Sequence, residues 1–264
     1  MALMRPVVLS IAGSDSGGGA GLQADWRAFE HFRVHGTTVV TAVTAQNPRT
    51  VLAVQPVAPE IVEAQLRAVF AAFAVRSAKT GMLFDAGIIA TVAAQLSGRR
   101  VPLVVDPVMV ATSGARLLRD DAVAALVSTI LPLAALITPN LPEAELLLGR
   151  SLPDAAAVAA AARELSRRYG AAVLVKGGHR QEAQACDCFC DGDRLWTIST
   201  PWVAAGSTHG TGCSLSAAAA AQLALGCSPL EAVCRAKAYV QAALRACVAV
   251  GPETWSMAAP EMLS

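Results

Sequence analysis

A cysteine follows two glycines at the start of an alanine-rich run in HGTGCSLSAAAAAQLALG, residues 209–226. Gly210, Thr211 and Gly212 leave the backbone free to turn its N–H groups toward one point, and the run after them predicts a helix. The N-terminus of a helix is electropositive, so this arrangement is typical of an anion-binding site. The same field favours the thiolate form of Cys213. An isolated cysteine could simply pack at a helix start, but the flanking glycines favour a functional role.

Charged and amide side chains stand at the ends of other apolar stretches. Asp106 follows PLVV and Lys176 follows VLV. A buried carboxylate without a partner is costly, so Asp106 is expected at a rim, near a metal ion or a phosphate. Lys176 suits a phosphate, on which lysine acts as a point charge. Asn140 and Glu143 have the spacing of a helix cap; they either only cap a helix or also bind Mg²⁺ through water.

The glycine-rich stretch AGSDSGGGAG, residues 12–21, follows the first predicted strand and opens the first predicted helix. It matches neither the P-loop pattern nor the dinucleotide-binding pattern G-x-G-x-x-G. Its four glycines between 17 and 21 weaken a purely structural loop, which favours a ligand-facing role over a flexible turn. Asp25 lies one turn into the helix and Gln46 ends the second predicted strand. A solvated carboxylate and a strand-end amide remain open alternatives for these two residues.

Cys186, Cys188 and Cys190 recur with period two, which places three thiols on one face of a strand. One strand cannot surround a tetrahedral metal ion, and His179 is the only nearby helper. Packing as small hydrophobic residues is therefore favoured over a metal site. The chain has seven cysteines without a framework spacing, which agrees with a reducing compartment.

Composition limits the remaining classes of function. The formal net charge of +1 gives no basic field for nucleic acid or an anionic membrane. No run reaches the roughly 20 apolar residues of a membrane span, and the apolar segment 7–12 is too short for a signal peptide. A cytoplasmic protein is expected. Three lysines stand against eighteen arginines, a skew that genome composition could explain. It also raises the question whether the lysines occupy places where arginine would not serve.

Short β-branched runs alternate with helical patterns along the chain, which predicts a single α/β domain over residues 1–264. The alternation indicates a mostly parallel sheet covered on both faces, with ligands beyond the carboxyl ends of its strands. Predicted strands are 7–12, 37–45, 78–83, 103–108, 135–138 and 172–176, with a hairpin formed by 186–190 and 195–199. Predicted helices are 20–32, 59–73, 85–96, 120–131 and 154–169, with two more closing the chain. The last of these begins at a capping box, Ser228 to Glu231.

Together these pieces resemble the hydroxymethylpyrimidine/phosphomethylpyrimidine kinases of the ribokinase-like superfamily. The motifs that carry the resemblance run in order over residues 7–245: AGSDSGGGAGLQAD, TAVTAQN, KTGML, VVDPVM, LITPNLPEAELLLG, VKGGH and THGTGCSLSAA. The resemblance implies a three-layer α/β/α fold and a homodimer. It also implies ATP as co-substrate and transfer of its γ-phosphate to the hydroxymethyl group of the pyrimidine, then to the resulting monophosphate, in thiamine diphosphate biosynthesis.

Residue roles follow from the same resemblance. Cys213 would take the proton of the acceptor hydroxyl, at the position where sugar-kinase relatives carry aspartate, while Gly210, Thr211 and Gly212 hold the transferring phosphoryl charge. The substrate ring would be bound by Gln46, Asp25, the backbone of Gly13, and Met82. Asp106, Asn140 and Glu143 would lie around Mg²⁺ and the phosphates, with Asn140 and Glu143 as the Mg²⁺ residues, Lys176 on the phosphate chain and Lys237 near the nucleotide.

The sequence departs from the family pattern in three places. Residues 111–115 lack an acidic residue often found there, Thr44 replaces a common valine, and the tail 251–264 lacks the usual Gly-His-Gly-Pro-like ending.

Two alternative functions stay open. A pyridoxal or pyridoxine kinase acts on a similar hydroxymethyl group, although Gln46 and Met82 favour the pyrimidine. A non-catalytic sensor of the pyrimidine would not need Asp106, Lys176 and the Gly210–Cys213 segment.

Overall fold

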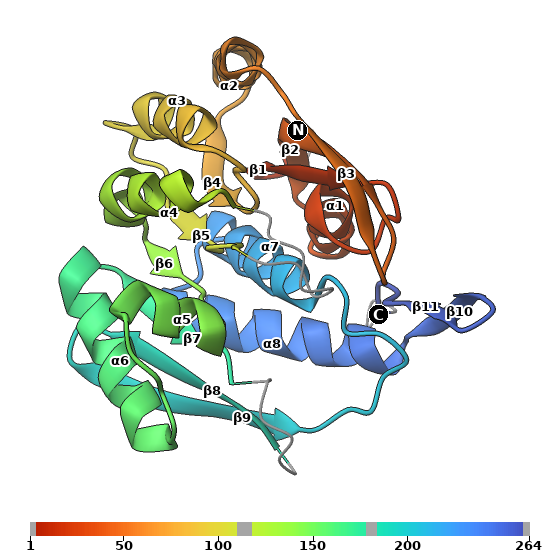
Figure 1. Ribbon diagram of the computed structural model, residues 1–264, viewed down its shortest axis with the longest axis vertical. Coiled ribbons are helices and arrows are strands. Elements are labelled where there is room, and N and C mark those ends of the chain that lie inside the picture. Colours follow the sequence, from red (N-terminus) through yellow and green to blue (C-terminus); the bar gives the residue numbers. More distant parts are fainter. Residues whose placement is uncertain (1–3, 110–117, 178–183, 261–264) are drawn as a thin grey trace.

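The computed structural model describes residues 4–109, 118–177 and 184–260 of the chain. Within these residues nine strands form one sheet in the order β3-β2-β1-β4-β5-β6-β7-β8-β9. Neighbours from β2 to β7 run parallel, whereas β3, β8 and β9 pair antiparallel at the edges (Figure 1). The strands are β1 (Val7–Asp15), β2 (His35–Gln46), β3 (Val51–Pro56), β4 (Val75–Thr80), β5 (Leu103–Val105), β6 (Leu136–Ile137), β7 (Ala172–Val175), β8 (Gln184–Asp191) and β9 (Arg194–Pro201). The mostly parallel sheet predicted from the alternating pattern is confirmed.

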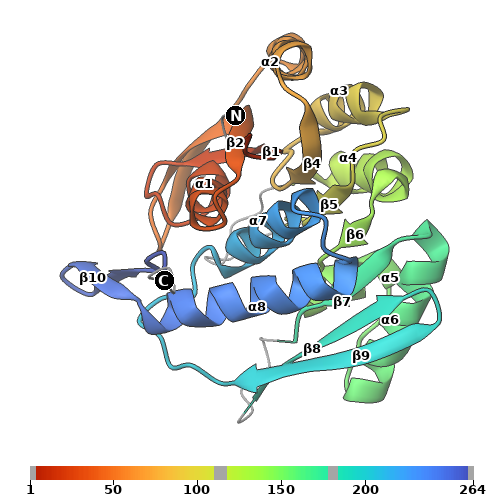
Figure 2. The same cartoon turned by 180° about the vertical axis from the view of Figure 1, so that it is seen from behind.

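Helices cover both faces of this sheet, so the predicted three-layer architecture is also confirmed. One face packs against α1 (Gly21–His31), α7 (Thr211–Ala224) and α8 (Pro229–Arg245), as Figure 2 shows from behind. The other face packs against α2 (Pro59–Ala72), α3 (Ala86–Leu96), α4 (Asp120–Ala125), α5 (Leu141–Leu148) and α6 (Ala155–Tyr169). No helix in the described part of the chain is long and apolar enough to cross a bilayer.

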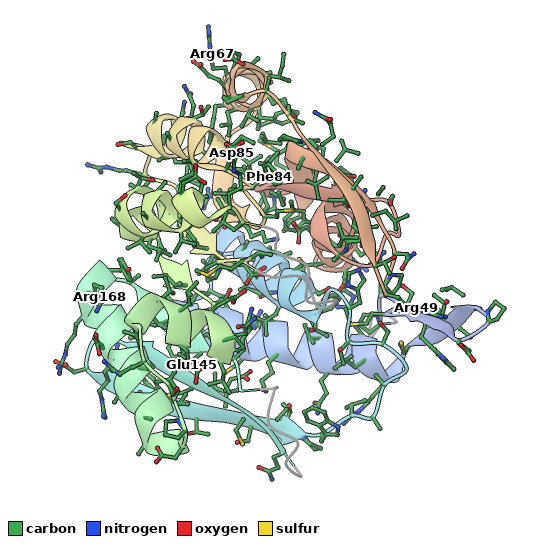
Figure 3. The ribbon with its side chains drawn as sticks, viewed as in Figure 1. Arg49, Arg67, Phe84, Asp85, Glu145 and Arg168 are labelled. Atoms are coloured by element: carbon green, nitrogen blue, oxygen red, sulfur yellow. The ribbon has the colours of Figure 1, made fainter. Side chains whose placement is uncertain are left out.

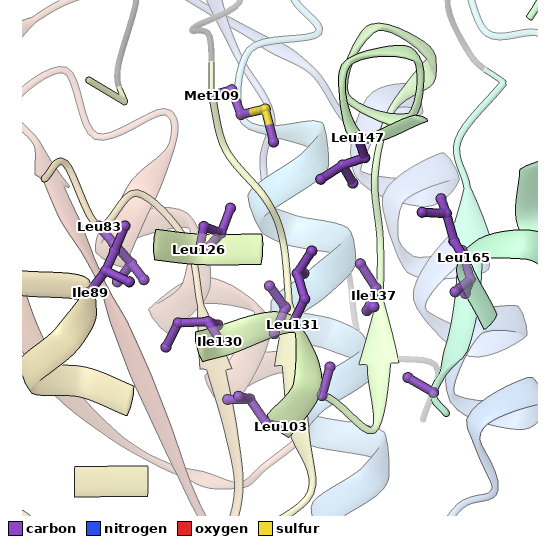
Figure 4. Close-up of a cluster of buried hydrophobic side chains, with 14 of the residues drawn as sticks. Leu83, Ile89, Leu103, Met109, Leu126, Ile130, Leu131, Ile137, Leu147 and Leu165 are labelled. Carbon is purple, nitrogen blue, oxygen red and sulfur yellow. The ribbon is translucent and has the colours of Figure 1, made fainter. Parts of the chain in front are cut away.

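Successive residues of the central strands belong to opposite hydrophobic cores. Leu103 and Val105 of β5 lie in the core shared with α3 and α4, whereas Val104 between them lies in the core shared with α7. Figure 4 shows Leu103 in the same buried cluster as Leu131 and Ile137. Because such strands are buried on both faces, they read as continuous apolar runs, and this made them recognisable in the sequence.

The cysteine triplet follows the same alternation on β8. Cys188 and Cys190 are buried in the core on the α6 side, and Phe189 between them faces the opposite core. Packing as small hydrophobic residues is confirmed for these two cysteines. Cys186 is half-buried, with its Sγ 3.3 Å from the hydroxyl of Ser199. His179 lies outside the described residues.

The start of α7 differs from the starts of α5 and α8, because no side chain caps it. Asn140 with Glu143 and Ser228 with Glu231 form reciprocal capping boxes at α5 and α8, as their spacing predicted. In contrast, α7 begins after Gly210, which has a φ of 83° and offers no side-chain cap. The first N–H groups of α7 therefore lack partners within the helix and point out of its end. The alanines of α7 are buried and let this helix lie close to its neighbours.

Several elements differ from the prediction. The edge strand β3 was missed; Asn47 Oδ1 accepts the N–H groups of Arg49 and Thr50 in the turn that leads into it. A hairpin of β10 (Val248–Gly251) and β11 (Thr254–Ser256) follows α8. Arg49 donates to the carbonyl oxygens of Pro252 and Glu253, and Figure 3 shows it beside this hairpin. The predicted helix 120–131 is helical throughout, but α4 passes into a π turn at Leu126. Residues 111–115 lie outside the described residues.

Gly210 should be intolerant of a side chain for two reasons, only one of which it shares with Gly98. Both have positive φ, 83° and 76°, but a Cβ at 210 would overlap the carbonyl oxygen of Gly19, whereas nothing lies within 4 Å of a Cβ at 98. Gly98→Ala should lower the free energy of unfolding by about 1–2 kcal/mol through backbone strain alone. Gly210→Ala should cost about 1–3 kcal/mol more because of overpacking. Urea denaturation measures both; equal losses would show that the Gly19 contact imposes no constraint.

Candidate active site

The polar residues that end the parallel strands meet at one edge of the sheet. The chain moves outward from β1 to β2 and later returns to place β4 on the other side of β1, so β1 and β4 flank a switch point. Open α/β sheets bind ligands beyond the carboxyl ends at such a point. The start of α7 faces this edge: a Cβ on Gly212 would lie 3.3 Å from Lys176 Nζ and 3.6 Å from Asp106 Oδ2. Asp106, Lys176 and the Gly210–Cys213 segment are thus brought together as predicted.

Asp106 is buried, and its partner is Lys176. The Lys176 Nζ lies 2.9 Å from Asp106 Oδ1, and the Ser216 hydroxyl donates to Asp106 Oδ2 at 3.2 Å. Asp106 was expected at a rim because the sequence showed no partner for a buried carboxylate; it is buried, and Lys176 is the partner. Burial opposes the charge of Lys176, but Asp106 and Glu143 hold the pKa of Lys176 above its usual value. Lys176 therefore places a positive charge beside the N-terminus of α7.

Glu143 lies in the same group of charges. Its carboxylate accepts the N–H of Asn140, and the Asn140 side chain accepts the N–H of Glu143, so both residues do cap α5. Burial raises the pKa of Glu143 to about 7, with Asp106 adding to the effect and Lys176 opposing it. A buried carboxylate with a raised pKa gains from a nearby cation. Carboxylate and amide oxygens also suit a hydrated Mg²⁺ completed by phosphate oxygens. Asn140 and Glu143 fit that ion, although no three acidic, His or Cys side chains in the described residues form a protein-only metal cluster.

Cys213 is partly buried in the first turn of α7. Burial raises the pKa of its thiol to about 11; Lys79 and a hydrogen bond from the backbone of Gly21 lower it, and Asp25 and Asp106 raise it further. Desolvation therefore outweighs the predicted contribution of the helix field, and the thiol form is favoured. Thr211 braces the turn by donating its hydroxyl and N–H to Thr208 O, at 2.9 and 3.2 Å. Its part in an anion hole stays a prediction.

A second buried ion pair lies beneath Cys213. Lys79 Nζ contacts both carboxylate oxygens of Asp25, at 2.9 and 2.8 Å, and the Ser10 hydroxyl donates to Asp25 Oδ2. Both members of the pair are fully buried. In this structure Asp25 is bound inside the fold by Lys79 and Ser10, and its predicted contact with the substrate ring stays a prediction. Lys79 was missed; a lysine in a strand that was predicted to be buried was the signal.

The glycine-rich loop after β1 is folded around its own carboxylate. Asp15 accepts the N–H groups of Gly17, Gly19 and Ala20 at 2.8–3.0 Å, and His209 Nε2 lies 2.9 Å from Asp15 Oδ2. These three N–H groups bind Asp15 and are not available to a ligand; a ligand-facing role for the rest of the loop stays a prediction. His209 and these backbone donors together hold the pKa of Asp15 below its usual range, against its burial. Asp15 and His209 were missed, although an aspartate two residues before a glycine run was a signal for such a turn.

A group of mostly apolar residues near Cys213 is the candidate ring-binding pocket. Met82 Sδ would lie 3.1 Å from a Cβ on Gly13, and Met82 packs with Ala42 and the partly buried Phe84. Phe84 follows β4 near the open edge of the sheet, where Figure 3 labels it. At the polar end, Gln46 Nε2 lies 3.4 Å from His209 Nε2. Gly13, Met82 and Gln46 come from three neighbouring segments of the sheet and can bind a flat, partly polar ring.

Thr44 and Lys237 have partners inside the fold. The Thr44 hydroxyl donates to the carbonyl oxygen of Ser14 at 2.9 Å, so this departure from the family pattern is satisfied within the sheet. Lys237 Nζ lies 2.6 Å from Asp187 Oδ2, and both side chains are buried. The predicted contact of Lys237 with the nucleotide stays a prediction.

The fold and this site define a ribokinase-like small-molecule kinase. A family model described as phosphomethylpyrimidine kinase matches residues 15–258. The hydroxymethylpyrimidine/phosphomethylpyrimidine kinase of Rhizobium meliloti (strain 1021) is 51% identical over 244 residues, 92% of each chain. The bifunctional thiamine biosynthesis protein ThiED of Geobacter sulfurreducens is 46% identical over 91% of this chain and 49% of its own length. The chain therefore belongs to the phosphomethylpyrimidine kinase family.

Solved structures agree with this assignment. The phosphomethylpyrimidine kinase of Clostridium difficile 630 superimposes with a TM-score of 0.80 at 36% identity, covering 90% of this chain and 98% of that one. The pyridoxal kinase of Staphylococcus aureus in complex with ADP gives a TM-score of 0.89 at 31% identity, covering 97% and 94%. The fold alone thus accommodates kinases named for either ring.

The raised pKa of Cys213 predicts a slow thiol at neutral pH. In the ligand-free protein, alkylation of Cys213 by iodoacetamide should rise about tenfold per pH unit between pH 7 and 10, following the thiolate fraction below a pKa of about 11. Mass spectrometry of the Cys213 peptide measures this rate, with the exposed Cys234 as an internal reference. Fast alkylation at pH 7 that no longer rises with pH would mean that the thiolate already exists.

Proposed function

We propose that this kinase transfers the γ-phosphate of ATP to 4-amino-5-hydroxymethyl-2-methylpyrimidine and then to the resulting monophosphate, in thiamine diphosphate biosynthesis. The observation that carries the proposal is the position of Cys213. It lies at the mouth of α7 beside the Asp106–Lys176 pair, and the pocket of Gly13, Met82 and Gln46 adjoins it through Gly21. One site therefore offers a phosphate-binding end and a ring-binding end. High identity to relatives with this name supports the same assignment.

The residues divide the work of phosphoryl transfer. The N–H groups of Gly212 and Cys213 and the Lys176 ammonium bind the transferring phosphoryl group, whose negative charge spreads over its oxygens. Gln46 and Met82 hold the ring so that its hydroxymethyl oxygen faces Cys213. The thiolate of Cys213, which is the minor form at neutral pH, takes the hydroxyl proton and becomes a thiol. As the hydroxyl oxygen bonds to the γ-phosphorus, the bond from that phosphorus to the β–γ bridging oxygen breaks, and ADP leaves. The positive charge of Lys79 below Cys213 stabilises its thiolate. Asn140 and Glu143 would hold Mg²⁺ through water, and the ion would neutralise charge on the phosphates.

Membership of the family gives three further expectations, which concern domain organisation, oligomeric state and cellular location. The chain acts as a single domain, it forms a homodimer, and it works in the cytoplasm with ATP and Mg²⁺. ADP complexes of structurally similar pyridoxal kinases support the nucleotide part of this proposal.

Product analysis tests the substrate. With ATP and Mg²⁺, the protein should convert the hydroxymethylpyrimidine to its monophosphate and then to its diphosphate, because the pocket ends in the Gln46 amide beside His209. Pyridoxal in a parallel reaction serves as the control. Phosphorylation of pyridoxal alone would overturn the pyrimidine assignment and leave the kinase chemistry intact. Absence of product in both reactions would favour the sensor.

The two acceptors predict that Cys213 matters unequally for the two steps. The first acceptor is a hydroxyl that must lose a proton, whereas the second is a phosphate monoester that is already largely ionised near neutral pH, since its second pKa is about 6. Cys213→Ala should therefore reduce the first phosphorylation about 10²–10⁴-fold, the usual contribution of a general base. It should reduce the second far less.

Separate assays starting from the alcohol and from the monophosphate measure the two rates, and calorimetry with the pyrimidine checks that binding survives. Cys213→Ser is the matched control that keeps a small hydrogen-bonding side chain. Equal losses in both steps would give Cys213 a positioning role, and unchanged rates would remove it from the mechanism.

A further inference from the structure

A third buried ion pair lies behind the segment that carries Lys176. Lys237 Nζ of α8 lies 2.6 Å from Asp187 Oδ2 of β8, and both residues are buried. The other carboxylate oxygen of Asp187 accepts the N–H of Gly177 at 2.9 Å. One carboxylate thus joins α8 to the residue directly after Lys176.

Gly177 is closely packed at this point. A Cβ on Gly177 would overlap the carbonyl oxygen of Cys186, so the main chain there lies against β8. On its other side, the N–H of Lys176 donates to Pro139 O at 2.9 Å, and Lys176 forms an isolated bridge with Asn140. The backbone of Lys176 is therefore held between β6 and β8, while its side chain reaches Asp106.

The charge of Lys237 explains how Asp187 can serve as this anchor. A buried carboxylate without a partner would take up a proton or move toward water, and it would then lose its N–H donor. The ammonium of Lys237, 2.6 Å from Asp187 Oδ2, supplies that partner and holds the carboxylate in place. Because Lys237 is itself buried against Asp187, its charge is engaged inside the fold.

We propose that Lys237 is a positioning residue: through Asp187 it fixes Gly177, and thereby holds Lys176 where the phosphate chain of ATP binds. This inference rests on the proposed function, in which Lys176 binds the phosphate chain. It gives Lys237 an indirect role in place of the predicted direct contact with the nucleotide. Asp187, which no sequence motif singled out, becomes as important as Lys237.

Hydrogen exchange of the Gly177 amide, followed by NMR in the nucleotide-free protein, tests the link itself. Lys237→Met, Asp187→Ala and the double variant should each speed this exchange at least about tenfold, since the hydrogen bond is lost. Lys79→Met is the matched control, because it removes another buried Lys–Asp pair while leaving Asp187 intact. Unchanged Gly177 exchange in Lys237→Met would overturn the proposal. If that variant unfolds, Lys237→Gln, which keeps a hydrogen-bond donor toward Asp187 where Met has none, is measured in the same way, and unchanged Gly177 exchange in it would also overturn the proposal.

Calorimetry with a non-hydrolysable ATP analogue separates positioning from direct contact. Loss of an outer supporting group typically weakens binding about 10–100-fold. Each single variant should therefore weaken analogue binding about tenfold, and the double variant should be no weaker, because the two residues act through one link. A loss for Lys237→Met with unchanged binding for Asp187→Ala would establish direct contact and overturn the proposal. A wild-type protein that binds no analogue would refute the kinase function, while the exchange experiment still decides the link.

Discussion

The whole site depends on a close approach of two backbones. The carbonyl of Gly19, in the loop after β1, lies where a side chain on Gly210 would have to stand. This contact brings the start of α7 against the carboxyl end of β1, and the positive φ of Gly210 turns the chain into the helix at that point. The loop can come so close because Asp15 folds it inward by binding three of its N–H groups. An internal carboxylate therefore shapes the wall against which the phosphate-binding helix begins.

Because its first residues lie against the loop after β1, α7 must lie inside the molecule. It packs between the sheet and α8, and its alanines are buried. Small side chains let the helix axis approach the sheet closely, and the helix end then points its free N–H groups at the strand ends. Larger residues along α7 would push that end away from Asp106 and Lys176. The low complexity of this helix is thus a packing requirement of the site.

Sequence patterns predicted the layers and most strand-end residues, because those signals are local. A buried parallel strand reads as an apolar run, and the capping boxes at Asn140 and Ser228 depend on residues three positions apart. The functions of Asp25 and Cys213 were harder to predict because they depend on distant partners. Asp25 is fully buried only because Lys79, 54 positions away, neutralises it. The pKa of Cys213 depends on burial that the packing of α1, β4 and α7 creates together.

The three lysines occupy places where arginine would not serve, which the scarcity of lysine in the sequence had raised as a question. Lys79, Lys176 and Lys237 are each paired with a single aspartate, Asp25, Asp106 and Asp187 respectively. A lysine presents a compact point charge on a slender stem, whereas the planar guanidinium of arginine carries five donors that all need acceptors when buried. Each lysine of this chain occupies a narrow interior place where one carboxylate can satisfy it. Arginines instead bind at the surface, as Arg150 and Arg167 do. Buried ion pairs of this kind contribute little net stability. What each pair does in the proposed site explains its placement better. The Lys79–Asp25 pair supports Cys213, the Lys176–Asp106 pair faces the phosphates, and the Lys237–Asp187 pair holds the backbone next to Lys176.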